Sequence, residues 1–136
     1  MENFINFQKV IWIDNDCILN LIQKKMLDII GFKGTVLEFN NGQEALEFVI
    51  KEFERLKTKS DNNLIVLDLE MPIMNGWEFL ERFQKLDPKI IDLFKIIVSS
   101  SSSDPEDIKR ALSFEFVDEY IPKPITIEVF KRIIWG

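Results

Sequence analysis

The chain has 136 residues, of which 46% are hydrophobic and 29% are charged, a balance typical of one globular domain rather than of a disordered chain. Its formal net charge is −6, and its basic residues are scattered among acidic ones, so the sequence does not predict a nucleic-acid surface. Cys17 is the only cysteine, which excludes a disulfide within the chain, and the lack of histidine excludes Ser-His catalysis and imidazole metal sites.

The sequence contains no apolar stretch long enough to span a membrane. The N-terminus lacks the basic start and the apolar block of a signal peptide, and a lone cysteine fits a reducing compartment. We therefore expect a cytoplasmic protein without membrane contact.

Short apolar runs alternate with apolar repeats at helix spacing in the first half of the chain. Residues 9–13 and 35–39 predict strands. A helix between these strands is indicated by the repeat at Ile18, Ile22, Met26 and Ile29. Asn41, with Glu44 three residues later, predicts the start of a second helix.

The same alternation continues in the second half of the chain. Residues 64–68, 94–98 and 117–121 predict strands. A helix after the first of them is indicated by Phe79, Phe83 and Leu86. The pair Asp104-Pro105 predicts the next helix, because proline is tolerated at the first helical position, and Thr126 caps a last one.

Five β-α units of this kind favour an α/β fold with one parallel sheet. The middle strands are continuous apolar runs, which is typical of strands that helices cover on both faces. Crossovers between parallel strands are right-handed, so few topologies remain. The simplest is a doubly wound, five-stranded sheet in the flavodoxin-like order 2-1-3-4-5.

Polar side chains follow the predicted strands where ligands bind in such sheets, outside the carboxyl ends. Asp14-Asn15-Asp16 follows the first strand, Asp68 ends the third, a serine run at 99–103 follows the fourth, and Lys123 follows the fifth. Clustered carboxylates attract a hard divalent cation such as Mg²⁺, and a carboxylate can act as a nucleophile on phosphorus. With a lysine to stabilise the transferring oxygens, this set predicts phosphoryl transfer.

Four segments carry a resemblance to a known family. They are VIWIDND, LIVLDLEMPIMNG, IIVSSSSSDPED and YIPKP. In this order and spacing they resemble a response-regulator receiver domain, the phospho-accepting module of two-component signalling. The resemblance covers nearly the whole chain, so we expect residues 1–136 to be one receiver domain, with residues 1–7 as an N-terminal extension and no output domain.

The resemblance implies a role for each matching acidic residue. Asp68 is similar to the phospho-acceptor, and Asp14 to the first member of an acidic pair that holds Mg²⁺. The expected metal ligands are Asp14, Asn15, Asp68 and the backbone carbonyl of Glu70. Asn15 departs from the family pattern, which has a second carboxylate there, so we expect weaker Mg²⁺ binding and slower phosphorylation.

The resemblance also implies switch residues. Ser100 resembles the switch hydroxyl, although Ser99 stays open because the serine run is uniform. Tyr120 resembles the switch aromatic, and Lys123 the lysine that pairs with the phosphate, with a cis bond to Pro124. From residue type alone, Asp16 is the better candidate for the cap of the first helix, and residues 101–103 are loop filler.

The resemblance implies two kinds of partner, one that donates the phosphoryl group and one that binds downstream. A histidine kinase or a histidine phosphotransfer protein would donate the phosphoryl group, and a downstream protein would bind the face formed by the helix after Asp104, the strand 117–121 and the last helix. The chain would not be a classical enzyme, although it could catalyse its own phosphorylation and dephosphorylation.

Two other functions remain open at this point. The chain could be a receiver-like interaction module that acts without phosphorylation, for which Asn15 is the support. It could also be a haloacid-dehalogenase-type phosphatase with Asp14 as nucleophile, because Asp14-Asn15-Asp16 fits the D-x-D motif of that class. The phosphatase reading leaves the Met-Pro-Asn-Gly segment unexplained.

Overall fold

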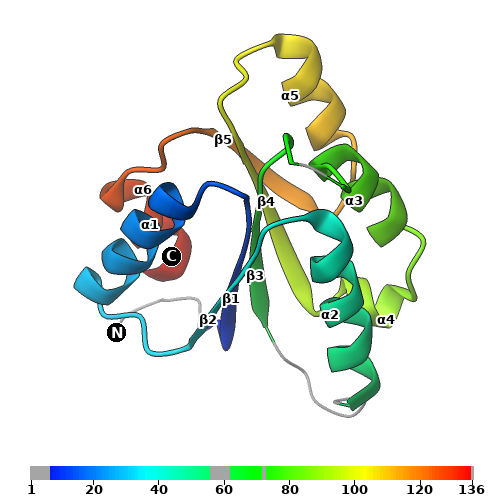
Figure 1. Ribbon diagram of the computed structural model, residues 1–136, viewed down its shortest axis with the longest axis horizontal. Coiled ribbons are helices and arrows are strands. Elements are labelled where there is room, and N and C mark those ends of the chain that lie inside the picture. Colours follow the sequence, from blue (N-terminus) through cyan, green and yellow to red (C-terminus); the bar gives the residue numbers. More distant parts are fainter. Residues whose placement is uncertain (1–6, 56–61, 72, 136) are drawn as a thin grey trace.

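The computed structural model describes residues 7–55, 62–71 and 73–135. In this part of the chain, five parallel strands form one sheet in the order β2-β1-β3-β4-β5, which confirms the predicted topology (Figure 1). The strands are β1 (Lys9–Ile13), β2 (Thr35–Phe39), β3 (Asn63–Leu67), β4 (Phe94–Ser100) and β5 (Val117–Pro122).

Helices cover both faces of the sheet, as the apolar strands predicted (Figure 1). The helices are α1 (Cys17–Ile29), α2 (Gly42–Arg55), α3 (Gly76–Phe83), α4 (Pro88–Ile91), α5 (Pro105–Leu112) and α6 (Ile127–Trp135). α1 and α6 lie on one face, while α2, α3, α4 and α5 lie on the other. No helix in the described ranges is both long and apolar enough to cross a membrane.

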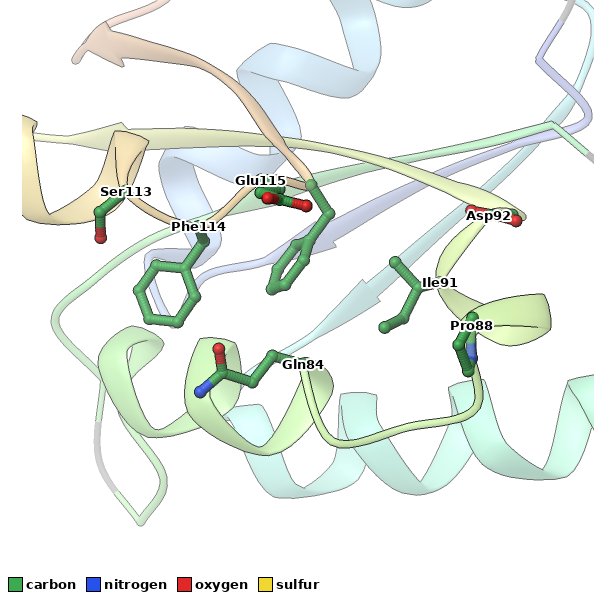
Figure 2. Close-up of a pocket in the computed structure, with 8 residues that line it drawn as sticks. Gln84, Pro88, Ile91, Asp92, Ser113, Phe114 and Glu115 are labelled. Carbon is green, nitrogen blue, oxygen red and sulfur yellow. The ribbon is translucent and has the colours of Figure 1, made fainter.

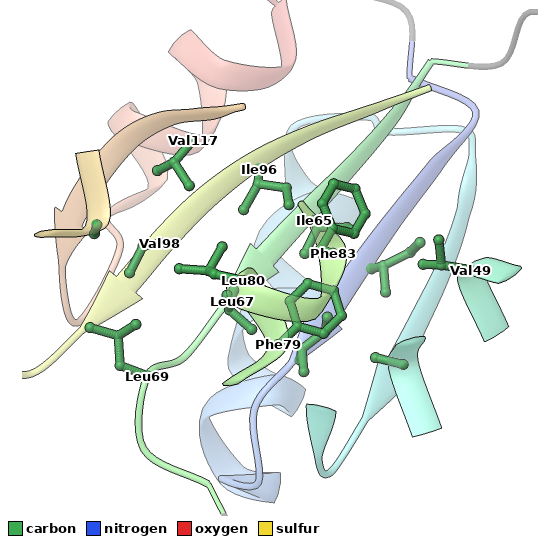
Figure 3. Close-up of a cluster of buried hydrophobic side chains, with 14 of the residues drawn as sticks. Val49, Ile65, Leu67, Leu69, Phe79, Leu80, Phe83, Ile96, Val98 and Val117 are labelled. Atoms are coloured by element: carbon green, nitrogen blue, oxygen red, sulfur yellow. The ribbon is translucent and has the colours of Figure 1, made fainter. Parts of the chain in front are cut away.

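The sheet separates two apolar cores, because successive side chains of a strand point to opposite faces. In β3, Ile65 and Leu67 pack toward α2 to α5, whereas Leu64 and Val66 pack toward α1 and α6. Figure 3 shows the first core, where the α3 side chains Phe79, Leu80 and Phe83 meet the strands. Both faces of β3 are therefore buried, which explains its unbroken apolar sequence.

α1 is a helix where it was predicted, but of the apolar repeat that indicated it only Met26 packs against the core, and Met26 is half-buried. Exposed on α1 are Ile18, Leu21, Ile22 and Ile29, with 46% to 74% of each residue accessible. The buried residues of α1 are Asn20, Gln23 and Leu27. We call the four exposed residues the α1 apolar stripe; they lie on one side of the helix because residues three and four apart are neighbours.

Two helices begin with the same pair of residues. The Asp104 side chain accepts a hydrogen bond from the Glu106 N–H at 3.0 Å, and Pro105 opens α5, as predicted. α4 was not predicted, although Asp87 and Pro88 repeat this signal, and Asp87 also caps its helix. The single turn of α4 carries too short an apolar repeat to show in the sequence.

The start of the domain differs from the expected boundary. Residues 1–7 were expected to form an extension, but Phe7 is buried in the core beside α1 and α6. The next residue, Gln8, donates its N–H to the Asn62 carbonyl at 2.8 Å. The first six residues of the expected extension lie outside the described residues.

Candidate functional site

The carboxyl edge of the sheet brings two carboxylates and one ammonium group together. Asp14 follows β1, Asp68 follows β3, and Lys123 follows β5. Lys123 Nζ lies 2.7 Å from Asp14 Oδ2 and 3.4 Å from Asp68 Oδ2. Asp14 and Asp68 are only 5% and 7% exposed, so the ion pairs are nearly removed from water.

Backbone hydrogen bonds between neighbouring strands fix these three residues. The Asp68 N–H donates to the Ile13 carbonyl at 2.9 Å, which continues the β1–β3 pairing by one residue. The Asp14 N–H donates to the Phe39 carbonyl at 3.0 Å on the other side of β1. The side chains therefore start from backbone held by the sheet, which limits how far they can separate.

The first turn of α1 also holds Asp14. The Asn20 side-chain amide donates to the Asp14 backbone carbonyl at 2.9 Å, and the Asp14 carboxylate accepts from the Asp16 N–H at 2.9 Å. The Asp16 side chain accepts from the Leu19 N–H at 3.0 Å, so Asp16 caps α1 as the sequence indicated. Asn20 was not predicted, because its buried position depends on how α1 packs on the sheet.

Gly76 allows the loop after Asp68 to fold back on itself. The Gly76 N–H donates to the Leu69 carbonyl at 3.0 Å. A Cβ atom at residue 76 would collide with the backbone oxygen of Asp68 and with the Leu69 Cα. Glycine is therefore needed here for close approach of two backbone segments, which keeps the start of α3 against the Asp68 loop.

Burial and charge act against each other at this edge. The pKa of Asp68 is raised, chiefly by burial and then by the nearby negative charge of Asp14. Lys123 and a hydrogen bond from the Glu70 backbone N–H lower it, but less strongly. For Lys123, burial lowers the pKa, but the Asp14 and Asp68 carboxylates together outweigh burial and raise it. The lysine therefore stays charged between two acids that repel each other.

Two of the residues expected to bind Mg²⁺ lie together at this edge. Asp14 and Asp68 share one ammonium group, while the Asn15 side chain is exposed. Within the described ranges, no three acidic, cysteine or histidine side chains gather as a metal site. Two carboxylates are nevertheless sufficient protein ligands for Mg²⁺, which keeps several waters, so the donor set fits this cation.

The two serines left open by the sequence differ in their partners. Ser100 Oγ accepts a hydrogen bond from the Ser102 N–H at 3.2 Å, and the Ser100 carbonyl accepts one from the Lys123 N–H at 2.9 Å. Ser99 Oγ is buried and has no hydrogen-bond partner in the described structure. Ser100 is thus the serine joined through the backbone to Lys123.

The β4–α5 loop also contacts Tyr120, which is half-buried on β5. The Tyr120 hydroxyl donates to the Ser102 carbonyl at 2.7 Å. Ser102 was expected to be loop filler, and that expectation is wrong, because its backbone and its side chain are hydrogen-bonded. The peptide bond between Lys123 and Pro124 is cis, as the resemblance implied.

A cavity of about 640 Å³ lies at the opposite edge of the sheet, before the starts of β4 and β5 (Figure 2). It is lined by Gln84, Pro88, Ile91, Asp92, Ser113, Phe114, Glu115 and Phe116. None of the residues predicted for the phosphoryl-transfer site lines this cavity. The acidic edge described above is therefore the candidate site on chemical grounds and not because it is the most hollow part of the surface.

Comparison with known proteins identifies the family of this chain. The family model described as response regulator receiver domain matches residues 10–134. The chain is 27% identical over 124 residues to the chemotaxis protein CheY1 of Helicobacter pylori, covering 91% of each protein. A crystal structure of a two-component response regulator from Cytophaga hutchinsonii superposes with a TM-score of 0.78 at 24% identity, covering 95% of each chain.

The Mn²⁺-bound form of response regulator Rcp1 has the same fold, with a TM-score of 0.73 at 19% identity over 93% of this chain and 88% of that one. Receiver domains are signalling switches of two-component systems rather than classical enzymes; phosphorylation on an aspartate is characteristic of them, and they generally bind Mg²⁺. With a family match that spans nearly all of its length, this chain belongs to the response regulator receiver domain family.

Proposed function

We propose that this chain is a phosphorylation switch whose acceptor is Asp68 and whose donor is a histidine kinase or a histidine phosphotransfer protein. The observation that carries the proposal is the contact of Lys123 Nζ with both Asp14 and Asp68, at 2.7 and 3.4 Å. This arrangement provides a nucleophile and a fixed positive charge within reach of the same phosphoryl group. In this proposal, phosphorylation changes how the domain binds another protein.

The chemistry needs no additional base. A carboxylate oxygen of Asp68 attacks phosphorus, the bond between phosphorus and the donor histidine nitrogen breaks, and an acyl phosphate forms on Asp68. Lys123 stabilises the negative charge on the phosphoryl oxygens, and the Ser100 hydroxyl donates a hydrogen bond to the product. Burial and the nearby charge of Asp14 raise the pKa of Asp68, which makes its carboxylate more basic than that of an ordinary aspartate.

Asp14, Asp68, the Asn15 amide oxygen and the Glu70 carbonyl would hold Mg²⁺. The cation would offset the negative charge of the two carboxylates and of the transferring phosphoryl group. Because Asn15 supplies a neutral oxygen where a carboxylate would add a charge, we expect an Asn15→Asp variant to bind Mg²⁺ more tightly in calorimetric titration. Equal affinity of the variant and the native chain would contradict this ligand assignment.

The α1 apolar stripe supports the proposal that the phosphoryl donor is a protein. Exposed apolar surface next to a reactive site is typical of a protein-protein contact, and Ile18 lies only four residues after Asp14. Phosphorylated histidine kinases and phosphotransfer proteins from the source organism can be compared by their initial rates of transfer to this chain. We expect Ile18→Ser and Ile22→Ser to slow transfer from the fastest donor and to leave phosphorylation by acetyl phosphate unchanged.

We propose that the downstream partner binds α5, β5 and α6. The support is that Ser100 and Tyr120 both contact the loop that leads into α5, so a change at Asp68 has a short path to this face. Cross-linking or NMR mapping with a captured partner tests the assignment. Partner contacts confined to α2 and α3 would contradict it.

The direct test of the phospho-acceptor uses acetyl phosphate as donor and the intact mass as readout, with and without Mg²⁺. We expect one added phosphate in the native chain with Mg²⁺, and none in Asp68→Ala. An unmodified native chain would favour an interaction module that acts without phosphorylation, for which Asn15 is the reason. Release of phosphate from a generic ester that is lost in Asp14→Ala but retained in Asp68→Ala would favour a phosphatase.

A further inference from the structure

Ser102 holds more of the β4–α5 loop together than any other residue in the serine run. Its N–H donates to Ser100 Oγ at 3.2 Å, and its carbonyl accepts from the Tyr120 hydroxyl at 2.7 Å. Its own hydroxyl donates to Asp107 Oδ2 at 2.8 Å and accepts from the Asp104 N–H at 3.2 Å. Ser102 therefore contacts both expected switch residues and the first turn of α5.

The flanking serines provide the contrast. Ser101 and Ser103 are exposed, and neither side chain makes a hydrogen bond to any described residue. The connections of Ser102 are thus not a general property of a serine-rich loop. They depend on this position, where the backbone faces Ser100 and Tyr120 while the hydroxyl reaches α5.

We propose that Ser102 is a positioning residue that couples the Ser100 and Tyr120 switch pair to helix α5. The proposal rests on the function proposed above, in which phosphorylation of Asp68 draws the Ser100 hydroxyl toward the phosphoryl group. When Ser100 Oγ turns, the hydrogen bond that it accepts from Ser102 breaks or pulls Ser102 with it. Because the Ser102 hydroxyl is bound to Asp107, either outcome changes the restraint on α5.

The hydrogen bond from the Ser102 hydroxyl to Asp107 is the contact that links the serine run to helix α5. Asp107 lies in the first turn of α5, a helix of eight residues. The bond joins a neutral hydroxyl to a carboxylate, which is stronger than a hydrogen bond between two neutral groups. Removing the hydroxyl leaves the backbone contacts of Ser102 with Ser100 and Tyr120 in place and removes its bonds to Asp107 and to the Asp104 N–H.

The structure contains a reporter for the movement of α5. The Arg110 guanidinium of α5 lies over the Trp77 ring of α3, 4.1 Å from its centroid, and also pairs with Glu81 at 3.5 Å. A shift of α5 changes the charge above the Trp77 ring. The indole N–H signal of Trp77 in an NMR spectrum, assigned with Trp77→Phe, therefore reports α5 directly.

The experiment records this signal before and after addition of acetyl phosphate and Mg²⁺, and measures the intact mass of the same samples. In the native chain we expect a shift of the Trp77 signal that follows the phosphorylated fraction. In Ser102→Ala we expect the same phosphorylated fraction but loss of most of the shift. Ser103→Ala, the matched control, should behave as the native chain, and Ser102→Thr, which keeps the hydroxyl, should restore the shift.

A double-mutant cycle isolates the bond to Asp107. If Ser102 acts through this carboxylate, Ser102→Ala combined with Asp107→Ala should lose no more of the shift than either single variant. Additive losses would contradict the route through Asp107.

Three results would overturn the inference, and they differ in what they leave standing. A full Trp77 shift in phosphorylated Ser102→Ala, or an equal loss in Ser103→Ala, overturns the role of Ser102 and leaves Asp68 phosphorylation intact. Lack of phosphorylation in the native chain overturns the proposed function and the inference together. The mass measurement separates these cases.

Discussion

Helices α1 and α3 flank the same sheet but use their apolar residues in opposite ways. α3 buries its apolar side chains Phe79, Leu80 and Phe83 in one core. α1 exposes its apolar stripe and buries Asn20 and Gln23. The difference teaches that apolar periodicity identifies a helix but not which side of the helix faces the core.

The largest expected effect in this comparison comes from truncating one apolar side chain in each helix. Phe83→Ala removes a buried ring that stacks on Phe79, so we expect a loss of about 3–5 kcal/mol in the free energy of unfolding. Ile29→Ala changes an exposed side chain of α1, so we expect a change below about 0.5 kcal/mol. Urea unfolding measures both. Similar losses in the two variants would show that α1 buries its stripe in solution.

The buried polar side of α1 gives the next largest effect. Asn20→Ala leaves the nearly buried Asp14 backbone carbonyl without the amide that donates to it at 2.9 Å, so we expect a loss of about 1–3 kcal/mol. Gln23→Ala truncates another buried polar side chain of α1, and its loss in the free energy of unfolding serves as the comparison. A neutral effect of Asn20→Ala in urea unfolding would mean that the amide does not hold Asp14.

Ile73 extends the comparison to the loop before α3, where another apolar residue is exposed. Ile73 is 75% exposed and has a φ of 69°, a conformation that a β-branched residue adopts only under strain. Asparagine tolerates this region, so we expect Ile73→Asn to raise the free energy of unfolding by about 1 kcal/mol. Ile73→Val keeps the β-branch and should give no gain; a gain from both variants would argue against backbone strain.

The smallest effect concerns the charges at the carboxyl edge of the sheet. The pKa of Asp68 is raised above 3.8 in the folded state, so the folded state binds this proton more tightly than the unfolded state does. The resulting contribution to the free energy of unfolding is fully present at low pH. It is lost as the pH rises through the folded-state pKa. In metal-free protein, Lys123→Gln should raise the pKa of Asp68 further, and Asp14→Asn should lower it. Carbon-13 NMR titration of the Asp68 carboxyl measures both shifts, and shifts of the opposite sign would contradict the electrostatic account.

The sequence was sufficient for most of the fold because strands buried on both faces and capped helices have local signals. The β1 and β2 bounds agree with their predicted runs, and Asp104-Pro105 opens α5 as predicted. The buried side of α1 could not be predicted, because it depends on how the helix is held at the sheet edge by Asn20.

The same limit applies to the candidate site. Motif order predicted that Asp14, Asp68 and Lys123 follow strands at one edge of the sheet, and the structure brings them into contact. Ser102 could not be distinguished from its neighbours in a run of five serines, because its role comes from hydrogen bonds to α5 and β5. The functional roles of all these residues stay predictions.

The account depends most on which carboxylate receives the phosphoryl group. Borohydride reduces an acyl phosphate to an alcohol, so it converts a phosphorylated aspartate into homoserine, which peptide mass spectrometry can locate. After treatment with acetyl phosphate and Mg²⁺, the account predicts homoserine at residue 68 and aspartate at residue 14. Homoserine at residue 14, with residue 68 unchanged, would contradict it.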